Sequence, residues 1–232
     1  MRWWIAGPAP MLAPLLALAG ACSYDAAFRD CEIECTDATG CPSGFSCGSQ
    51  GLCRPTGVTA ATCRLAACDG GPVDVLANGD FDAIDLPWRQ EPATPSLLCG
   101  EPLIRPDSGA FAACLGAGGD NSVKTLSRDI PLPAGAVSAR LAGRLCIATA
   151  ETQGPDRDVL DFDILAGDVA IGPLGRRANQ QGAATCDYAS FTLDAPLTAD
   201  PVTATFRIRS TLDVGESTSF FLDSLVLTVA CR

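Results

Sequence analysis

Cysteine content is the feature that most restricts the folds open to this chain, because 13 of its 232 residues are cysteines. They are dense between residues 31 and 68 and widely spaced after that. In exported proteins such cysteines pair as disulfides, whereas the cytosol keeps thiols reduced. The sequence therefore predicts a cross-linked fold if the chain leaves the cytoplasm.

The start of the chain has the properties of an export signal. Arg2 is the only charge before a short apolar run from Met11 to Ala21, and no acidic residue precedes Asp25. A basic start, a short apolar run and a small-residue end mark a secretory signal peptide. A spanning helix needs about 20 apolar residues, and this run is shorter. We therefore expect residues 1–21 to be removed as a signal peptide.

The end of this segment, Leu18-Ala19-Gly20-Ala21-Cys22, resembles the lipobox of bacterial lipoproteins. The resemblance implies cleavage before Cys22 and acylation of that cysteine, including an acyl chain such as palmitate. It also implies attachment to the cell envelope, and Ser23 favours the outer membrane. The alternative is an ordinary secretory signal, with Cys22 free or in a disulfide.

The parity of the cysteines agrees with lipidation of Cys22. If that residue carries lipid, twelve cysteines remain, and all of them can pair. Of the possible pairs we expect Cys99–Cys114 first, because the short segment between them carries turns at Pro102 and Gly109. The predicted disulfide cysteines are Cys31, Cys35, Cys41, Cys47, Cys53, Cys63, Cys68, Cys99, Cys114, Cys146, Cys186 and Cys231.

Charge and composition exclude several classes of function. The formal net charge of −11 argues against nucleic acid as a partner. The chain contains no histidine, so Ser-His-Asp sites, Cys-His sites and zinc sites that need imidazole are excluded. Asp161 and Asp163 lie two apart on one expected strand and point to the same side, so they do not flank a glycosidic bond. We therefore expect a protein without enzymatic activity.

Residues 22–68 form a predicted disulfide-rich module. Such a segment cannot bury enough apolar surface by itself, so cross-links supply the stability. The run Cys41-Pro42-Ser43-Gly44-Phe45-Ser46-Cys47 resembles small modules near the start of bacterial surface lipoproteins. A zinc ribbon is the alternative, but it needs paired Cys-x2-Cys knuckles, and the chain has none. Residues 69–72 are a predicted linker.

From residue 73 to 232 the pattern changes to short strands separated by turns. Residues 159–165 alternate, with Leu160, Phe162 and Ile164 on one face. Residues 202–209 alternate as well, with Thr203, Thr205, Arg207 and Arg209 facing outward, and residues 220–231 are more fully apolar. Further strands are expected near 110–116, 123–130, 137–148, 168–172 and 188–194. Many short strands without helical periodicity predict an all-β sandwich or jelly roll.

Several pieces of this region resemble the galactose-binding-like jelly roll that many carbohydrate-binding modules share. These are Asn78-Gly79-Asp80-Phe81-Asp82 followed by Trp88, the segment 130–136, and the closing run Phe221-Leu222-Asp223. The resemblance implies that the opening turn packs against the closing strand and that Trp88 lies in the core. It also implies a structural calcium held by Asp80 and Asp223. The alternative is that Asp223 only accepts hydrogen bonds from the backbone of the 78–82 turn.

A saccharide site needs aromatic surface and hydrogen-bonding side chains. Tyr188 is the candidate exposed platform, and we place the polar candidates in one loop: Arg176, Arg177, Asn179, Gln180 and Gln181. The alternative is that this loop is merely solvated. We expect a lipoprotein that displays a β-sandwich for interaction with a glycan or an envelope protein. The alternatives are a carbohydrate-binding module proper and a purely structural envelope component.

Overall fold

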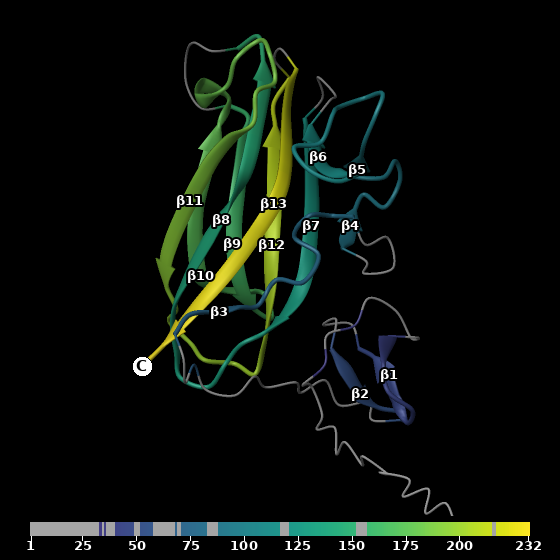
Figure 1. The fold of residues 1–232 in the computed structure, drawn as a ribbon. Coiled ribbons are helices and arrows are strands. Elements are labelled where there is room, and N and C mark those ends of the chain that lie inside the picture. Colours follow the sequence, from purple (N-terminus) through teal and green to yellow (C-terminus); the bar gives the residue numbers. More distant parts are fainter. Residues whose placement is uncertain are drawn as a thin grey trace, which may run out of the picture.

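The computed structural model of this chain is a jelly-roll β-sandwich, preceded by a short disulfide-bonded hairpin (Figure 1). It describes residues 33, 35, 40–48, 52–57, 68, 71–82, 88–116, 121–151, 157–214 and 217–232. The expected signal peptide (residues 1–21), Cys22, Cys31 and Cys63 lie outside the described residues. Among the residues described, no helix is long and apolar enough to cross a membrane.

Two antiparallel sheets face each other across the core. One has the strand order β10-β9-β12-β7-β4, and the other has the order β11-β8-β13-β6-β5, with β3 beside β13. The strands of the first sheet are β4 (Arg89–Glu91), β7 (Ser122–Pro131), β9 (Val159–Ala166), β10 (Val169–Ala178) and β12 (Thr203–Leu212). Those of the second are β3 (Val73–Asp74), β5 (Leu98–Cys99), β6 (Ala112–Gly116), β8 (Ala136–Thr149), β11 (Ala189–Pro196) and β13 (Thr218–Cys231).

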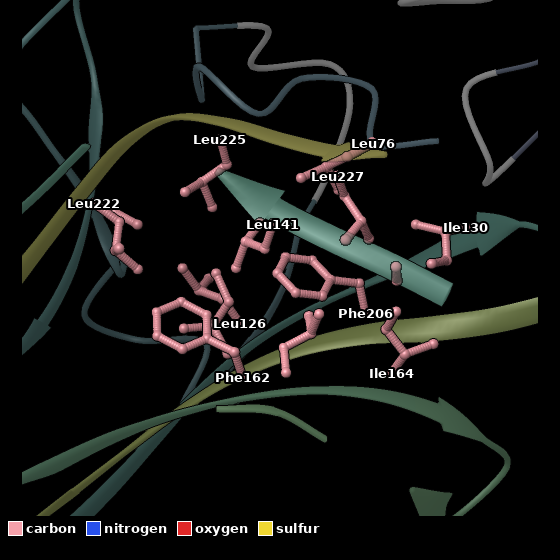
Figure 2. Close-up of a cluster of buried hydrophobic side chains, with 14 of the residues drawn as sticks. Leu76, Leu126, Ile130, Leu141, Phe162, Ile164, Phe206, Leu222, Leu225 and Leu227 are labelled. Atoms are coloured by element: carbon pink, nitrogen blue, oxygen red, sulfur yellow. The ribbon is translucent and has the colours of Figure 1, made fainter. Parts of the chain in front are cut away.

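The core lies between the two sheets, as the alternation of apolar residues predicts. In β9 the side chains of Leu160, Phe162 and Ile164 are fully buried. Figure 2 shows Phe162 and Ile164 among leucines of the facing sheet, including Leu141 and Leu222. Burying a side chain of this size contributes about 1.5–3 kcal/mol, so these strands are held mainly by their inward faces.

The opening turn packs against the closing strand, as the family resemblance implies. The backbone nitrogen of Leu225 in β13 donates to the carbonyl oxygen of Gly79 at 2.8 Å. A Cβ atom at Gly79 would lie 1.8 Å from the carbonyl oxygen of Leu225, so only glycine allows this approach. Trp88 is 3% exposed and packs on Phe81, with ring centroids 5.2 Å apart. Its expected place in the core is confirmed.

The cysteine-rich segment contains the hairpin β1 (Phe45–Cys47) and β2 (Cys53–Pro55). Disulfides Cys35–Cys47 and Cys41–Cys53 hold it. Three of these cysteines lie close enough together to resemble a metal site. Because each is bonded to another cysteine, none offers the thiolate that zinc needs, and the disulfide prediction is confirmed for these four residues.

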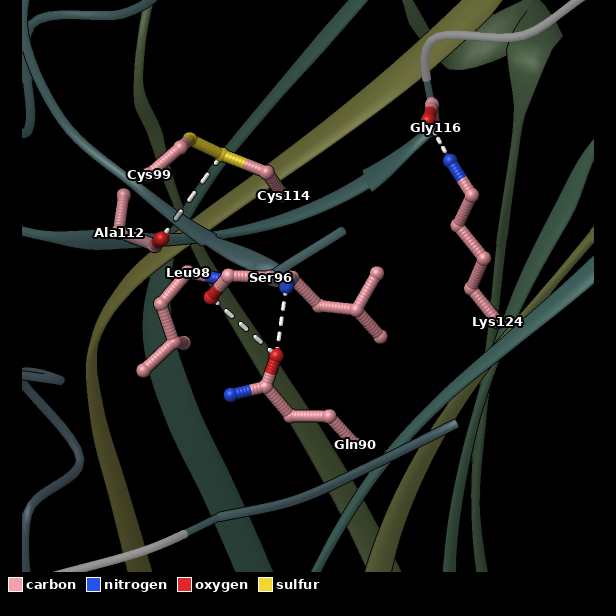
Figure 3. Close-up of a disulfide and its surroundings, with 9 residues drawn as sticks. Gln90, Ser96, Leu98, Cys99, Ala112, Cys114, Gly116 and Lys124 are labelled. Atoms are coloured by element: carbon pink, nitrogen blue, oxygen red, sulfur yellow. Dashed lines mark hydrogen bonds between the residues drawn. A yellow bond between two sulfur atoms is a disulfide. The ribbon is translucent and has the colours of Figure 1, made fainter. Parts of the chain in front are cut away.

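Three more disulfides fix the sandwich. Cys68 is joined to Cys231 in β13, Cys146 in β8 to Cys186, and Cys99 to Cys114. The pairing expected first, Cys99–Cys114, is confirmed. Figure 3 shows this disulfide beside a hydrogen-bonded cluster in which Gln90 accepts from the backbone nitrogen of Leu97 and from the Ser96 hydroxyl. Lys124 donates to the carbonyl oxygen of Gly116 nearby.

Candidate functional site

A hollow lies where an edge strand of one sheet, β10, meets an edge strand of the other, β11. The edge strand β10 and the 3-10 turn η2 (Asn179–Gln181) form one side, and β11 with the segment before it forms the other. Its volume of about 520 Å³ is within the usual range of small-molecule pockets. The lining residues are Leu145, Ile147, Arg177, Gln181, Gly182, Ala183, Thr185, Asp187, Ala189, Ser190, Phe191 and Thr192.

The rim of this hollow is fixed to the end of β8. Ala183 donates to the carbonyl oxygen of Ile147 at 3.1 Å, and Thr149 donates back to that of Ala183 at 2.8 Å. The Cys146–Cys186 disulfide ties the same segment to β8 a few residues away. Gly182 lies so close that a Cβ atom would be 2.7 Å from the carbonyl oxygen of Ile147. The segment before β11 is therefore held to β8 by two backbone hydrogen bonds and a disulfide.

The side chain of Asn179, the first residue of η2, points into the protein interior and not into the hollow. It is fully buried, and its side chain accepts from the backbone nitrogen of Arg157 and donates to the carbonyl oxygen of Glu151. The sequence offered Asn179 as a ligand-binding residue of a loop; the structure leaves its amide no exposed face, and ligand binding by Asn179 stays a prediction. Gln181, in contrast, lines the hollow, and its Oε1 accepts from the nitrogen of Ala178 at 3.2 Å. Its amide nitrogen is left to donate to a ligand.

Arg177 belongs to a strand and not to a loop. The strand expected at residues 168–172 extends to Ala178, so both Arg176 and Arg177 lie on β10. Arg177 points across the sandwich edge, where its guanidinium carbon lies 5.7 Å from the centroid of the Phe191 ring in β11. Its Nη1 donates to the carbonyl oxygen of Arg176 at 3.0 Å. The guanidinium is thereby held at the mouth of the hollow.

Arg176 faces the other way and is not part of the hollow. Because side chains alternate along a strand, it lies on the outer face of its sheet, paired with Asp161 at 2.6 Å. Asp163 pairs in the same manner with Arg207 at 2.7 Å. The sequence did not indicate these ion pairs, and they leave Asp161 and Asp163 with structural partners.

Tyr188 does not form an exposed platform. The residue is only partly exposed, and its hydroxyl oxygen is buried without a hydrogen-bond partner in the described part of the chain. Burial, with the nearby charges of Asp223 and Asp107, raises the pKa of Tyr188 to about 12. Its backbone oxygen accepts from Arg144, which also pairs with Asp107 at 3.0 Å. Tyr188 therefore secures the segment leading to the hollow.

The two predicted calcium ligands have protein partners. Asp223 is fully buried, and its oxygens accept from the backbone nitrogens of Ser108 and Ser224 at 2.8 and 2.6 Å. Asp80 accepts from the nitrogen of Asp82 at 3.4 Å. The donors to Asp223 come from residues 108 and 224, so the alternative in which it binds the backbone of the 78–82 turn is wrong. Calcium binding by Asp80 and Asp223 stays a prediction.

Sequence reasoning missed a group of three carboxylates at the end of the sandwich. The side-chain oxygens of Glu151, Asp158 and Asp213 lie within 4.8 Å of one another. Arg157 lies near two of them, 3.7 Å from Glu151 and 3.8 Å from Asp213. Glu151 and Asp158 are close in the sequence, but Asp213 comes 55 residues after Asp158. The group therefore forms only in the folded protein, and no local motif indicated it.

Sequence reasoning also missed most of the hollow. Of the predicted ligand residues, the structure places Arg177 and Gln181 in its lining and leaves out Tyr188, Arg176 and Asn179. Asp187, Ser190 and Thr192 join it from a segment that carried no ligand-binding motif. If the strand expected at 168–172 had been extended to residue 178, the alternation of side chains would have placed Arg176 and Arg177 on opposite faces. That alternation was the one sequence signal for this part of the hollow.

Comparison with known proteins finds similar solved structures at low sequence identity and no matching family. A scan of protein-family models finds no match, and neither does a search of curated proteins. Solved structures do match. One is TmCBM61, solved with β-1,4-galactotriose, which is 13% identical with a TM-score of 0.39. The match covers 67% of this chain and 97% of TmCBM61. A family 16 carbohydrate-binding module is also 13% identical, with 70% and 95% covered and a TM-score of 0.39.

An enzyme also appears among the similar structures. The α-L-arabinofuranosidase MgGH51, solved with arabinose, is 12% identical and gives a TM-score of 0.48 over 72% of this chain. The match covers only 29% of that enzyme. At these identities and TM-scores the matches carry no argument, so fold and function are argued from the strands and residues of this chain.

Proposed function

We propose that this protein binds a saccharide, without modifying it, in the hollow between β10 and β11. The observation that carries the proposal is the composition of the lining. Leu145, Ile147, Ala183, Ala189 and Phe191 provide apolar surface, and polar side chains from Arg177, Gln181, Thr185, Asp187, Ser190 and Thr192 surround it.

This combination suits a sugar ring. Binding sites are mostly apolar, with a few polar groups that fix the orientation of the ligand. A pyranose offers C–H surface to the apolar residues and hydroxyl groups that both donate and accept. Asp187 supplies an acceptor, Gln181 and Arg177 supply donors, and the hydroxyls of Thr185 and Thr192 do both.

Binding without catalysis fits the ionisable residues. The chain has no histidine, and retaining or inverting glycosidases need two carboxyl groups on opposite sides of the bond, about 5–9.5 Å apart. Asp187 is the only carboxylate among the described residues that line the hollow. Asp161 and Asp163, which the sequence offered as a pair, are held by Arg176 and Arg207 on an outer face.

The proposal also places the protein at the cell envelope. The lipobox-like segment ending at Cys22 supports acylation of that residue. The ten cysteines that the structure describes are all paired with one another. Two acyl chains suffice for stable anchoring, whereas one holds a protein only marginally. The lipid would hold the saccharide-binding sandwich at the membrane surface, in the outer membrane if Ser23 directs sorting.

A glycan array probed with the purified full chain tests saccharide binding. We expect saturable binding to one class of glycan, weakened at least about tenfold in Asp187→Ala, because Asp187 is exposed in the lining. Asp168→Ala is the matched control, since Asp168 is an exposed aspartate in the β9–β10 turn, outside the lining. No binding to any glycan, or equal loss in both variants, would contradict the proposal.

Intact mass spectrometry of the protein from the membrane fraction tests the anchor. We expect a chain that begins at Cys22 and carries acyl groups, with no free thiol. A soluble product that begins at another residue would end the lipoprotein proposal and leave saccharide binding unaffected.

A further inference from the structure

Arg177 differs from most arginines of the sandwich in its lack of an acidic partner. Among the residues that the structure describes, its guanidinium meets only the Phe191 ring and the carbonyl oxygens of Arg176 and Thr192. The arginines that do form ion pairs with aspartate or glutamate are Arg89, Arg140, Arg144, Arg157, Arg176 and Arg207.

The chain has ample acid to neutralise such a group, since it carries 27 acidic and 16 basic residues. Leaving this guanidinium without a carboxylate therefore needs a local reason, although it is partly exposed. The surroundings of Arg177 provide one, because the neighbouring backbone carbonyls and the Phe191 ring hold the group without neutralising its charge. An arginine guanidinium has five N–H donors in a planar fork, and the two hydrogen bonds given above use only part of that fork.

We propose that the hollow takes an acidic sugar residue, whose carboxylate pairs with Arg177; this rests on the proposed saccharide binding. A guanidinium and a carboxylate form two parallel hydrogen bonds, which fix both distance and orientation. The hydroxyl groups of the same ring would meet Gln181, Thr185 and Asp187. The ligand class is then a uronic acid within an oligosaccharide.

The charge of the whole chain limits what kind of acidic ligand fits. At −11 the net charge repels a polyanion at long range, although salt screens this repulsion beyond about 8 Å at physiological ionic strength. The attraction is confined to Arg177, so one carboxylate at a defined position should dominate recognition. Further uronate residues outside the hollow should add little.

Titration calorimetry of the full chain tests this with three matched sets of short oligosaccharides. The sets are galacturonate and glucuronate oligosaccharides, their methyl esters, and the corresponding neutral galactose and glucose oligosaccharides. We expect a uronate to bind at least about tenfold more tightly than its ester and its neutral parent, which is the order of effect of a charge-assisted hydrogen bond. Equal or tighter binding of the neutral sugar would overturn the acidic ligand while leaving saccharide binding in place. No binding of any of them would contradict both proposals.

Substitution of Arg177 tests whether this residue causes the tighter binding of uronate. Arg177→Gln should remove the difference between uronate and ester but leave the weaker neutral binding, and Arg177→Lys should keep part of the difference. Arg209→Gln is the matched control, since Arg209 is an exposed arginine on the outer face of β12. A uronate preference that survives in Arg177→Gln would refute the assignment. Arg177→Gln could also lower the melting temperature of the protein. In that case the Arg177→Lys variant and the ligand series with the unaltered protein still test the uronate preference.

Discussion

The carboxylate of Asp223, fully buried in the last strand, accepts a hydrogen bond from the backbone nitrogen of Ser108 at 2.8 Å. Ser108 belongs to the long connection between β5 and β6, so this contact ties that connection to β13. A second tie runs from Asp107 of the same loop to Arg144 of β8 at 3.0 Å. The loop is thus fastened over the sheet that also carries the rim of the hollow.

Removing the Asp223 carboxylate should loosen the loop. In Asp223→Ala the backbone nitrogens of Ser108 and Ser224 lose their acceptor, and we expect the free energy of unfolding to fall by about 1–3 kcal/mol. Asp223→Asn keeps an acceptor and removes a charge whose burial raises the pKa of the group, so its loss should be smaller. Urea denaturation measures both. An alanine variant as stable as the unaltered protein would contradict this account.

Calcium should have little effect on stability. The oxygens of Asp223 already accept from Ser108 and Ser224, and calcium needs six to eight oxygen ligands free to coordinate. We expect the melting temperature of the full chain to be the same in excess calcium and in EDTA. A rise with calcium that disappears in Asp80→Ala would instead support the structural calcium that the family resemblance implies.

The Cys99–Cys114 disulfide should stabilise the fold by restricting the unfolded chain. It joins cysteines 15 positions apart, and a loop of that length is worth about 3 kcal/mol. We expect the double variant Cys99→Ala, Cys114→Ala to lose about 2–4 kcal/mol of unfolding free energy. Single variants are unsuitable controls because they leave a free thiol. If the double variant unfolds at the same urea concentration as the unaltered protein, the cross-link is not a source of stability.

Arg128 should reduce stability, because its charge is buried and only partly offset by the neighbouring charge of Asp129. It is 2% exposed on the inner side of β7, and neither terminal guanidinium nitrogen has a hydrogen-bond partner in the described part of the chain. Burial lowers the pKa of Arg128 accordingly. Arg128→Met keeps the aliphatic packing and should raise the free energy of unfolding by about 1–4 kcal/mol. Arg209→Met, at an exposed position, should change it by no more than about 0.5 kcal/mol. A destabilised Arg128→Met protein would show that the guanidinium is needed.

The ion pair of Arg89 and Asp129 should make the free energy of unfolding depend on pH in the acidic range. Two hydrogen bonds from Arg89, with help from Thr205, hold the pKa of Asp129 below its usual value. Such a group contributes stability above the ordinary aspartate pKa, about 4, and loses it as the pH falls through the lower pKa of the folded state. The stability difference between the unaltered protein and Arg89→Gln should therefore be constant above about pH 5 and shrink below about pH 4.

Unfolding measured across that pH range checks the prediction. Arg209→Gln controls for the general loss of one positive charge from the same outer face. A difference that grows as the pH falls would have the wrong sign and would refute the role given to Arg89.

The sequence by itself determined the fold class and the faces of the strands. Alternation in residues 159–165 placed Leu160, Phe162 and Ile164 in the core, and the structure buries all three. This succeeded because side chains alternate with period two whatever lies beside the strand. The packing of the Asn78-Gly79 turn against the closing strand was implied by the family resemblance. The structure shows its reason, since only glycine allows the approach to Leu225.

Only the tertiary structure decided which edges meet and which polar residues surround the hollow. Arg177 and Phe191 lie on the edge strands of different sheets, and no local pattern specifies that these edges adjoin. Tyr188 looked exposed in the sequence, but its hydroxyl is buried in the folded chain, where the charges of Asp223 and Asp107 act on it. Local sequence sets the direction of each side chain relative to its own strand, whereas the pairing of distant strands sets what that side chain contacts.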